Sequence, residues 1–322
     1  MARSPQITLV ITAYNRREFI LQSIKCALTQ TLERENYEIL VIKNYRDETI
    51  DKFIEKHQIK SIIADGIEGE YPFIALQHAE GEIISFLDDD DLMSEKKLYS
   101  VYEIFKDSKV GYYHNNFDVV LSDEIISNKL INSPPYKTMR VSTKKKRRYL
   151  YYLEKKALYI NNSCISIRKD VLSKFAGFLK EQNANIDRFL YVSALLSEYD
   201  LYFDNIILNS YRIHNDQTSA MISDDYMTLR EKKLRFITKS IGAHANILKL
   251  SKGTEFEPYC ATRLMNLQLA YNFWSFENKY KFKLKAYIQY LLEGDVFEIP
   301  LLLIYKTPKF VRNYIIKIIY KI

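Results

Sequence analysis

The sequence predicts an α/β fold: a mostly parallel sheet flanked by helices and followed by a helical carboxyl-terminal region. Short β-rich runs alternate with helical patterns over the first hundred residues, which is the arrangement of right-handed βαβ units. From about residue 223 onward, the apolar spacing is helical to the end. A chain of 322 residues is long enough for one large domain and a smaller one. We therefore expect a catalytic or binding domain over residues 1–220 and a helical region over 221–322.

The elements follow one another in a regular order at first. The expected strands are residues 6–14, 37–44, 60–65 and 82–87, and the expected helices between them are 17–31, 47–57 and 71–80. After residue 98 the alternation loosens. We expect a helix over 92–105, a strand over 110–121, a turn at 132–136, a basic helix or mobile loop over 142–157, a strand running into a helix over 158–170, a helix over 189–196 and a strand over 202–214.

The composition excludes several classes of protein. With 47% hydrophobic and 27% charged residues, the chain is globular and not disordered. Its three cysteines are far apart and form no CxxC pair, which argues against a disulfide framework or a zinc site and favours a reducing compartment. No run of eighteen apolar residues and no signal peptide is evident, so we expect a cytoplasmic protein.

Four adjacent carboxylates, Asp88 to Asp91, come directly after the apolar run GEIISFL. Like charges this close repel one another, and the carboxyl end of a strand in an open α/β sheet is where ligands bind. Hard oxygen ligands in an Asp-x-Asp arrangement suit Mg²⁺ or Mn²⁺ together with substrate phosphates. A solvated surface cluster is one alternative. A helix amino cap by Asp91 or Ser94 is another, with Asp91 favoured for the cap.

Four segments, in this order and spacing, resemble the family 2 glycosyltransferases: ITLVITAYNRREFI, YEILVI, GEIISFLDDDDLMSEKKL and NSYRIHNDQTS. The resemblance covers about residues 5–220 and implies the Rossmann-like GT-A fold. It implies that a sugar is transferred with inversion from a nucleotide-sugar donor, with a UDP-sugar favoured, to a glycan or lipid-linked acceptor. It also implies a Mn²⁺ or Mg²⁺ cofactor and a role in polysaccharide or glycan biosynthesis.

The same resemblance assigns roles to individual residues. Asp90 would coordinate the metal and His214 would contact it or the diphosphate, while Asp88 and Asp89 would reach the ribose or the sugar. At the end of the first strand, Thr12 would offer a polar contact and Tyr14 a stacking face for the base. Structural roles for Tyr14 as a core aromatic and for His214 as a hydrogen-bonding residue stay open.

Two segments depart from the family pattern. After the second strand, Lys43 and Asn44 replace the usual two aspartates, and the Asn44 amide could still pair with uracil. At residues 71–73 the chain reads Tyr-Pro-Phe where the family tends to have Ala-Arg-Asn, so the Arg that assists the phosphates is missing. Lys43, Arg16 or Arg17 could compensate for it.

An inverting transfer needs a base, and Asp187 matches the family carboxylate that deprotonates the acceptor. A plain helix-start role for Asp187 is the alternative. Two other functions stay open. A degenerate GT-A scaffold would bind no nucleotide with metal, and a sugar nucleotidyltransferase would release pyrophosphate.

The net charge of +7 arises from the carboxyl-terminal third of the chain. A helix over 308–322 would carry apolar residues on one face and Lys and Arg on the other, which is typical of a helix that lies on a membrane surface. It could equally dock on the protein's own core or on a second subunit. No aromatic stacking motif of the kind that binds nucleic acid accompanies the basic run 144–148, so we expect no nucleic acid there. A phosphate-bearing acceptor or an anionic membrane would fit the run, and a solvated helix face is the alternative.

Overall fold

The computed structural model describes residues 5–121, 124–126, 136–214 and 225–293, together with 308 and 311. The chain divides into two compact units. The first comprises Met1–Gln182 and Ile186–His214, and the second comprises Asn183–Asn185 and Asn215–Ile322.

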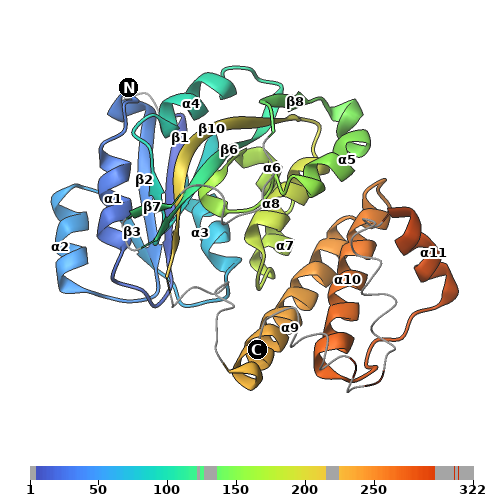
Figure 1. The fold of residues 1–322 in the computed structure, drawn as a ribbon. Helices are drawn as coiled ribbons and strands as arrows, with labels where there is room; N and C mark the ends of the chain where they lie inside the picture. Colours follow the sequence, from blue (N-terminus) through green and yellow to red (C-terminus); the bar gives the residue numbers. More distant parts are fainter. Residues whose placement is uncertain are drawn as a thin grey trace. The chain divides into compact units, whose positions relative to one another are not determined.

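A ten-stranded sheet forms the centre of the first unit (Figure 1). Its main path runs in the order β3-β2-β1-β4-β9-β6-β10-β5, while β7 pairs with β6 and β8 with β10. The strands β1 to β4 are parallel, and β10 is parallel to β6, while β5, β7, β8 and β9 run antiparallel to their partners. Their bounds are β1 Ile7–Ala13, β2 Tyr37–Lys43, β3 Lys60–Ile63, β4 Ile83–Asp88, β5 Leu92–Met93, β6 Val110–Leu121, β7 Glu124–Ile126, β8 Met139–Val141, β9 Ile165–Arg168 and β10 Asp200–Ile213. The predicted α/β fold is confirmed, and its sheet is mixed, with four parallel and five antiparallel strand pairings.

Helices cover both faces of this sheet. The odd-numbered residues of β1 pack against α1 (Ile20–Leu28), in one cluster that also takes in α2 (Glu48–Lys56) and α4 (Lys97–Phe105). The helices α3 (Glu70–His78), α6 (Lys169–Ser173) and α8 (Ile186–Leu195) contact the sheet without joining that cluster, so they cover the opposite face. A strand buried on both faces reads as a continuous apolar run, which is why ITLVITA identified β1.

The parallel register brings the ends of several strands to one edge. Thr12 on β1 lies opposite Asp88 on β4, and Ala13 lies opposite Lys43 on β2. The strand β10 follows β6 in the same direction and ends one residue before His214. Segments far apart in the sequence therefore meet at the carboxyl edge of the sheet, where ligands bind in open α/β folds.

The predicted helix over 92–105 begins only at Lys97, because Leu92 and Met93 form β5 and pair with β10. The prediction that Asp91 caps this helix is wrong, since its N-cap is Lys96 and no side chain caps it. The Asp91 carboxylate is buried and accepts hydrogen bonds elsewhere, from Ser163 and from the backbone of β10.

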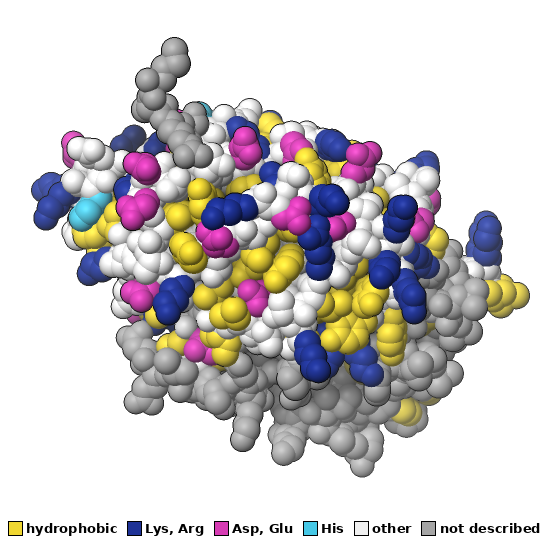
Figure 2. Space-filling view, turned by 90° about the horizontal axis from the view of Figure 1, so that it is seen from above, with side chains coloured by type: hydrophobic (Ala, Val, Ile, Leu, Met, Phe, Trp, Pro, Cys, Tyr) yellow, Lys and Arg dark blue, Asp and Glu magenta, His cyan; other side chains and the backbone are white. Residues whose placement is uncertain are grey.

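The basic run 144–148 forms an ordered turn, η3 (Thr143–Lys145), and the start of α5 (Lys146–Lys155). Lys146 is buried, and its Nζ donates to the carbonyl oxygens of Ala194, Leu195 and Ser197 at 2.7, 3.2 and 2.6 Å. Ala194 and Leu195 lie in the last turn of α8 and Ser197 just beyond it, so Lys146 acts as a cationic cap at the carboxyl end of this helix. Lys144, Lys145 and Arg148 are exposed. Figure 2 shows basic side chains interspersed with exposed hydrophobic ones on one face of the molecule.

The first unit also contains η1 (Arg34–Asn36), η4 (Asn162–Cys164) and α7 (Ala176–Lys180). The second unit is helical, as predicted, with α9 (Tyr226–Leu250), α10 (Glu257–Ser275) and α11 (Leu284–Glu293). Among the described helices, none has the length and apolar character needed to cross a membrane. The helix expected over 308–322 lies outside the described residues, apart from Pro308 and Val311.

Candidate active site

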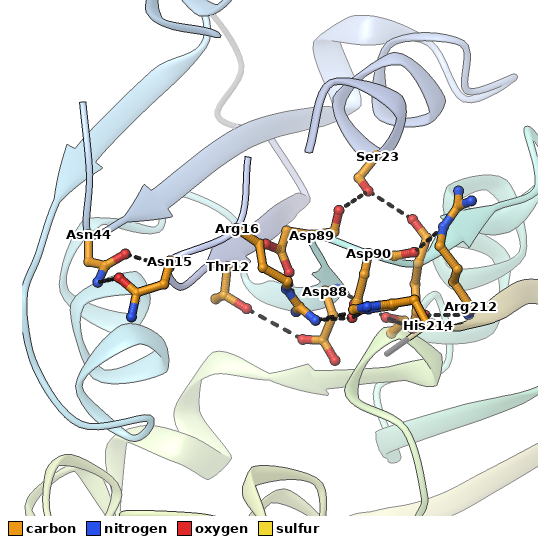
Figure 3. Close-up of polar contacts among 12 residues, drawn as sticks. Thr12, Asn15, Arg16, Ser23, Asn44, Asp88, Asp89, Asp90, Arg212 and His214 are labelled. Atoms are coloured by element: carbon orange, nitrogen blue, oxygen red, sulfur yellow. Dashed lines mark hydrogen bonds and ion pairs between the residues drawn. The ribbon is translucent and has the colours of Figure 1, made fainter. Parts of the chain in front are cut away.

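The Asp88–Asp91 segment turns sharply after β4, and hydrogen bonds from α1 hold its backbone. The Oγ atom of Ser23 on α1 lies 2.9 Å from the carbonyl oxygen of Asp89 and 2.8 Å from that of Asp91. Asp89 and Asp91 are 1% exposed, and Asp90 is 8% exposed. Asp88 is half-buried, and Thr12 Oγ1 lies 3.4 Å from its Oδ1 atom (Figure 3).

One guanidinium joins two of these carboxylates. Arg16 Nη2 donates to Asp89 Oδ1 at 2.5 Å, and Arg16 Nη1 donates to Asp90 Oδ2. Arg16 stands just after β1, and Figure 3 shows its side chain reaching between the two aspartates. Arg16 thus places a cation at the acidic cluster. In the sequence it was one of three candidates to replace the missing family Arg.

His214 lies at the same cluster, and its predicted contact with a metal or a diphosphate stays a prediction. Its Nε2 atom is 3.0 Å from Asp90 Oδ2 and 3.2 Å from Arg16 Nη1. The preceding strand also supplies Arg212, which is 2% exposed and donates from Nε to the Asp90 carbonyl oxygen at 2.9 Å. The backbone N–H of Arg212 donates to Asp91 Oδ1 at 3.1 Å. Arg212 therefore fixes the end of β10, and with it His214, against the Asp cluster.

Burial makes the negative charge of this cluster costly. Burial, with further repulsion from Asp90 and Asp89, raises the pKa of Asp88 to about 7. Burial also raises the pKa of Asp89 to about 7, although Arg16 acts in the opposite direction. Desolvation and like charges both disfavour a carboxylate, and one guanidinium does not offset them here. Additional positive charge at the cluster would keep all of these groups ionised.

Among the residues that the structure describes, no group of three or more His, Cys, Asp and Glu side chains is arranged to hold a metal ion. The donor chemistry of the cluster nevertheless fits Mn²⁺ or Mg²⁺. Asp89 Oδ2 is buried without a hydrogen-bond partner, and Asp90 Oδ2 and His214 Nε2 already lie side by side. Carboxylate oxygens with one imidazole are ligands that Mn²⁺ accepts.

The residues predicted to contact the base lie at the ends of β1 and β2. Tyr14 is 54% exposed, and its ring meets that of Tyr71 edge-on at 6.2 Å, so it is no core aromatic. Asn44 and Asn15 form a closed pair: Asn44 Oδ1 accepts from the Asn15 backbone N–H, and Asn44 Nδ2 donates to Asn15 Oδ1, both at 2.8 Å. Each end of the Asn44 amide is thus engaged once, which leaves a second N–H and a second lone pair for a base.

Two of the three cations proposed to replace the missing family Arg are engaged elsewhere. Lys43 is fully buried and forms an ion pair with Asp51 at 2.6 Å, so it points into the core. Arg17 lies over the Tyr45 ring at 4.3 Å and 3.8 Å from Asp47. Of the three candidates, Arg16 is the one that reaches the acidic cluster in this structure.

Asp187 lies in the first turn of α8. Its Oδ1 atom accepts the backbone N–H of Arg188 at 2.7 Å, and the Asn161 backbone N–H is also hydrogen bonded to its carboxylate. Burial raises the pKa of Asp187, which makes the carboxylate more basic. No direct hydrogen bond joins it to the Asp88–Asp91 segment among the described contacts, so its role as the base stays a prediction.

Residues 161–163, which contact both Asp187 and the Asp88–Asp91 segment, were not among the residues predicted for the site. Ser163 Oγ donates to Asp91 Oδ2 at 2.6 Å and accepts the Asp88 backbone N–H at 3.0 Å. The Asn162 side chain hydrogen bonds to the Asp88 carboxylate, and Asn161 contacts Asp187. Asn161 holds a φ of 78°, in the left-handed region that Asn tolerates better than most residues. The Asn-Asn-Ser run itself was the available signal in the sequence.

Comparison with known proteins is consistent with this geometry. The family described as "Glycosyl transferase family 2" matches residues 8–176. A curated relative, the Escherichia coli UDP-Glc:alpha-D-GlcNAc-diphosphoundecaprenol beta-1,3-glucosyltransferase WfgD, is 26% identical over 125 residues, 37% of this chain and 49% of the relative. In each of five curated relatives, the match spans about half of the relative's length or less.

Two solved structures are similar over most of the chain. Residues 1–349 of S. aureus TarS, in complex with UDP-GlcNAc, give a TM-score of 0.54 at 14% identity and cover 89% of this chain and 79% of that one. The mannosyltransferase PcManGT from Pyrobaculum calidifontis, with GDP-Man and Mn²⁺, also gives 0.54 at 14% identity, covering 94% and 79%. At this identity, the likeness shows the fold alone, the GT-A fold with a helical carboxyl-terminal region. With the family match over more than half of its residues, the chain belongs to glycosyl transferase family 2, a family of sugar-transferring enzymes.

Proposed function

We propose that this protein is a metal-dependent inverting glycosyltransferase that moves a sugar from a nucleotide-sugar donor to a glycan or lipid-linked acceptor. The observation that carries the proposal is the convergence of Thr12, Asp88, Asp90 and His214 at the carboxyl edge of the sheet. A UDP-sugar is the favoured donor, because WfgD is named for UDP-Glc and TarS was solved with UDP-GlcNAc. Tyr14 and Thr12 would contact the nucleoside.

A Mn²⁺ or Mg²⁺ ion would be held by Asp90 and His214, with Asp89 Oδ2 as a further oxygen ligand. Bound there, the ion would neutralise the donor diphosphate and stabilise the charge that develops on it as it leaves. PcManGT, whose structure contains Mn²⁺ and GDP-Man, supports this expectation. The degenerate-scaffold alternative rested partly on the missing family Arg, and Arg16 supplies a guanidinium at the same cluster.

Asp187 would act as the base. The acceptor hydroxyl oxygen forms a bond to the anomeric carbon, the bond from that carbon to the diphosphate oxygen breaks, and the hydroxyl proton passes to the Asp187 carboxylate. Burial raises the pKa of Asp187, which suits a group that must take a proton near neutral pH. Replacement of Asp187 should therefore reduce turnover while leaving donor binding intact.

We further propose that the second unit lies on an anionic lipid surface on the cytoplasmic face of a membrane. On α11, Leu284 is 75% exposed and Ile288 is 50% exposed. The exposed lysines Lys279, Lys281, Lys283 and Lys285 surround Leu284 in the sequence. Exposed apolar side chains can insert into the headgroup region of a bilayer, and lysines beside them can pair with anionic headgroups. Anchoring would raise the effective concentration of a lipid-linked acceptor.

The catalytic proposal is tested by measuring the binding of UDP, GDP, CMP and dTDP by calorimetry, with Mn²⁺ and with EDTA. We expect UDP to bind only with Mn²⁺, and Asp90→Asn to abolish that binding. Asp107→Asn is the matched control, because Asp107 pairs with Arg140 ahead of the amino end of β6. Failure of all four nucleotides to bind under either condition would favour the scaffold instead.

The membrane proposal is tested by flotation with vesicles of phosphatidylglycerol or phosphatidylcholine. We expect flotation only with the anionic vesicles, and its loss when Lys281 and Lys283 are both changed to Glu. A variant in which Lys109 and Lys174 are changed to Glu makes the same change of charge on the first unit, where both lysines are exposed. Equal flotation of the two double variants would contradict a role for α11.

A further inference from the structure

Arg16 occupies an unusual position for a surface-loop cation. Its two terminal nitrogens contact Asp89 Oδ1 and Asp90 Oδ2, and Nη1 also lies 3.2 Å from His214 Nε2. Its Nε atom is buried without a hydrogen-bond partner, and its side chain is only 26% exposed. Figure 3 shows the guanidinium in the midst of the site residues. The group is therefore enclosed by the acidic cluster and retains one donor that this arrangement does not satisfy.

Two of the atoms that Arg16 contacts, Asp90 Oδ2 and His214 Nε2, are atoms that the proposed metal would need. Asp90 Oδ2 and His214 Nε2 cannot direct the same lone pairs toward a guanidinium N–H and a divalent cation. Two cations within a few ångströms of each other also repel strongly in a partly buried site. A metal can reach these ligands only if the guanidinium moves away.

We propose that Arg16 is an internal counter-ion that is exchanged during donor binding: it neutralises Asp89 and Asp90 before the metal binds, and it pairs with the donor diphosphate afterwards. This inference rests on the proposed metal-dependent function. The planar fork of a guanidinium matches phosphate oxygens as well as carboxylates, so the same group can serve both partners. Arg16 would then perform the phosphate contact of the Arg that is absent from residues 71–73.

The exchange couples the two ligands. Metal alone must compete with Arg16 and binds weakly, whereas metal with a nucleoside diphosphate gives the displaced guanidinium a new partner and binds more tightly. By linkage, the diphosphate must favour the metal as much as the metal favours the diphosphate. Removal of Arg16 should therefore strengthen binding of the metal alone and weaken this coupling.

The test measures Mn²⁺ binding by electron paramagnetic resonance, with and without UDP or GDP. For Arg16→Gln we expect Mn²⁺ alone to bind about 10-fold to about 100-fold more tightly than to the wild type, the range for losing one hydrogen bond between charged groups. The tightening of Mn²⁺ binding by UDP should shrink by about as much. Arg17→Gln is the matched control, because Arg17 is 52% exposed and contacts Asp47.

A second variant guards against misfolding of Arg16→Gln. Arg16→Lys keeps a cation at the carboxylates but has no planar fork, so Mn²⁺ alone should bind within about threefold of the wild type while the effect of UDP is reduced. Metal-dependent nucleotide binding in the wild type, with Mn²⁺ affinity unchanged in Arg16→Gln, overturns the exchange and leaves the proposed function standing. Absence of Mn²⁺ and nucleotide binding in the wild type overturns both.

Discussion

Ser163→Ala should destabilise the protein far more than the loss of a single hydroxyl group usually does. Ser163 is fully buried, and its Oγ atom serves two partners in the acidic segment. It donates to the Asp91 carboxylate at 2.6 Å and accepts the Asp88 N–H at 3.0 Å. Alanine leaves a buried carboxylate with one hydrogen bond fewer and a backbone N–H without a partner.

The magnitude follows from these two losses. A hydrogen bond to a charged group contributes about 1.5–3 kcal/mol, and leaving a buried amide unsatisfied costs about 1–3 kcal/mol. Asp91 keeps its bond from the Arg212 backbone, so the two losses do not add fully. We expect the free energy of unfolding to fall by about 3 kcal/mol, which corresponds to a drop of about 1 M in the urea midpoint.

Urea denaturation followed by circular dichroism measures this change, and Ser166→Ala is its matched control. Ser166 is equally buried, but its Oγ atom donates to Ser85 Oγ at 2.9 Å within the sheet and has no bond to the acidic segment. The control should lose about 1 kcal/mol and keep its nucleotide affinity. Equal losses of stability in both variants, with equal nucleotide affinity, would refute the assignment of Ser163 as the support of the Asp segment.

Three further predictions concern other parts of the first unit. Lys146→Met should lower the free energy of unfolding by about 3 kcal/mol, because three carbonyls at the end of α8 lose the hydrogen bond from a buried ammonium group, whereas exposed Lys145→Met should change it by less than about 0.5 kcal/mol in the same urea assay. Burial lowers the pKa of His114 from 6.5 to about 4, so between these pH values the imidazole is protonated in the unfolded chain and neutral in the folded protein. Stability should therefore fall by up to about 3 kcal/mol as the pH drops from about 6.5 to about 4, and His114→Gln should flatten that part of the stability profile. Asp187→Asn should lower kcat in a sugar-transfer assay by about 10²-fold to 10⁴-fold with unchanged nucleotide affinity, and a loss of affinity equal to the loss of rate would argue for a purely structural role.

Elements buried on both faces were the easiest to predict from the sequence. The runs ITLVITA and YEILVIK are apolar almost without interruption, because the helices on both sides of the sheet exclude water from them. Their polar ends then mark the edge of the sheet where the site forms. The resemblance to the family assigned Asp90 and His214 to one metal site, and in the structure Asp90 Oδ2 and His214 Nε2 lie 3.0 Å apart, just beyond the carboxyl ends of two strands.

Buried cations were the hardest to predict. Lys43, Lys97 and Lys146 are all fully buried, although lysine is among the residues least often found inside a protein. Each is tolerated because oxygen atoms surround its ammonium group, as Asp51 and the Tyr45 carbonyl do for Lys43. Lys97 donates to Asn115, which lies on β6. A sequence reveals the charge of such a residue but not the partner that the fold brings to it.

The run of four aspartates illustrates the same limit, because its members look alike in the sequence and differ in the fold. The Asp91 side chain points inward, where it accepts hydrogen bonds from Ser163 and from the Arg212 backbone, so it stabilises the conformation of the segment. Asp89 and Asp90 turn toward Arg16, and Asp88 toward Thr12. The Asp91 carboxylate is therefore held from inside the fold, whereas those of Asp89 and Asp90 share the Arg16 guanidinium. The four carboxylates of FLDDDD have different partners, and only the long-range contacts of the fold decide which aspartate has which.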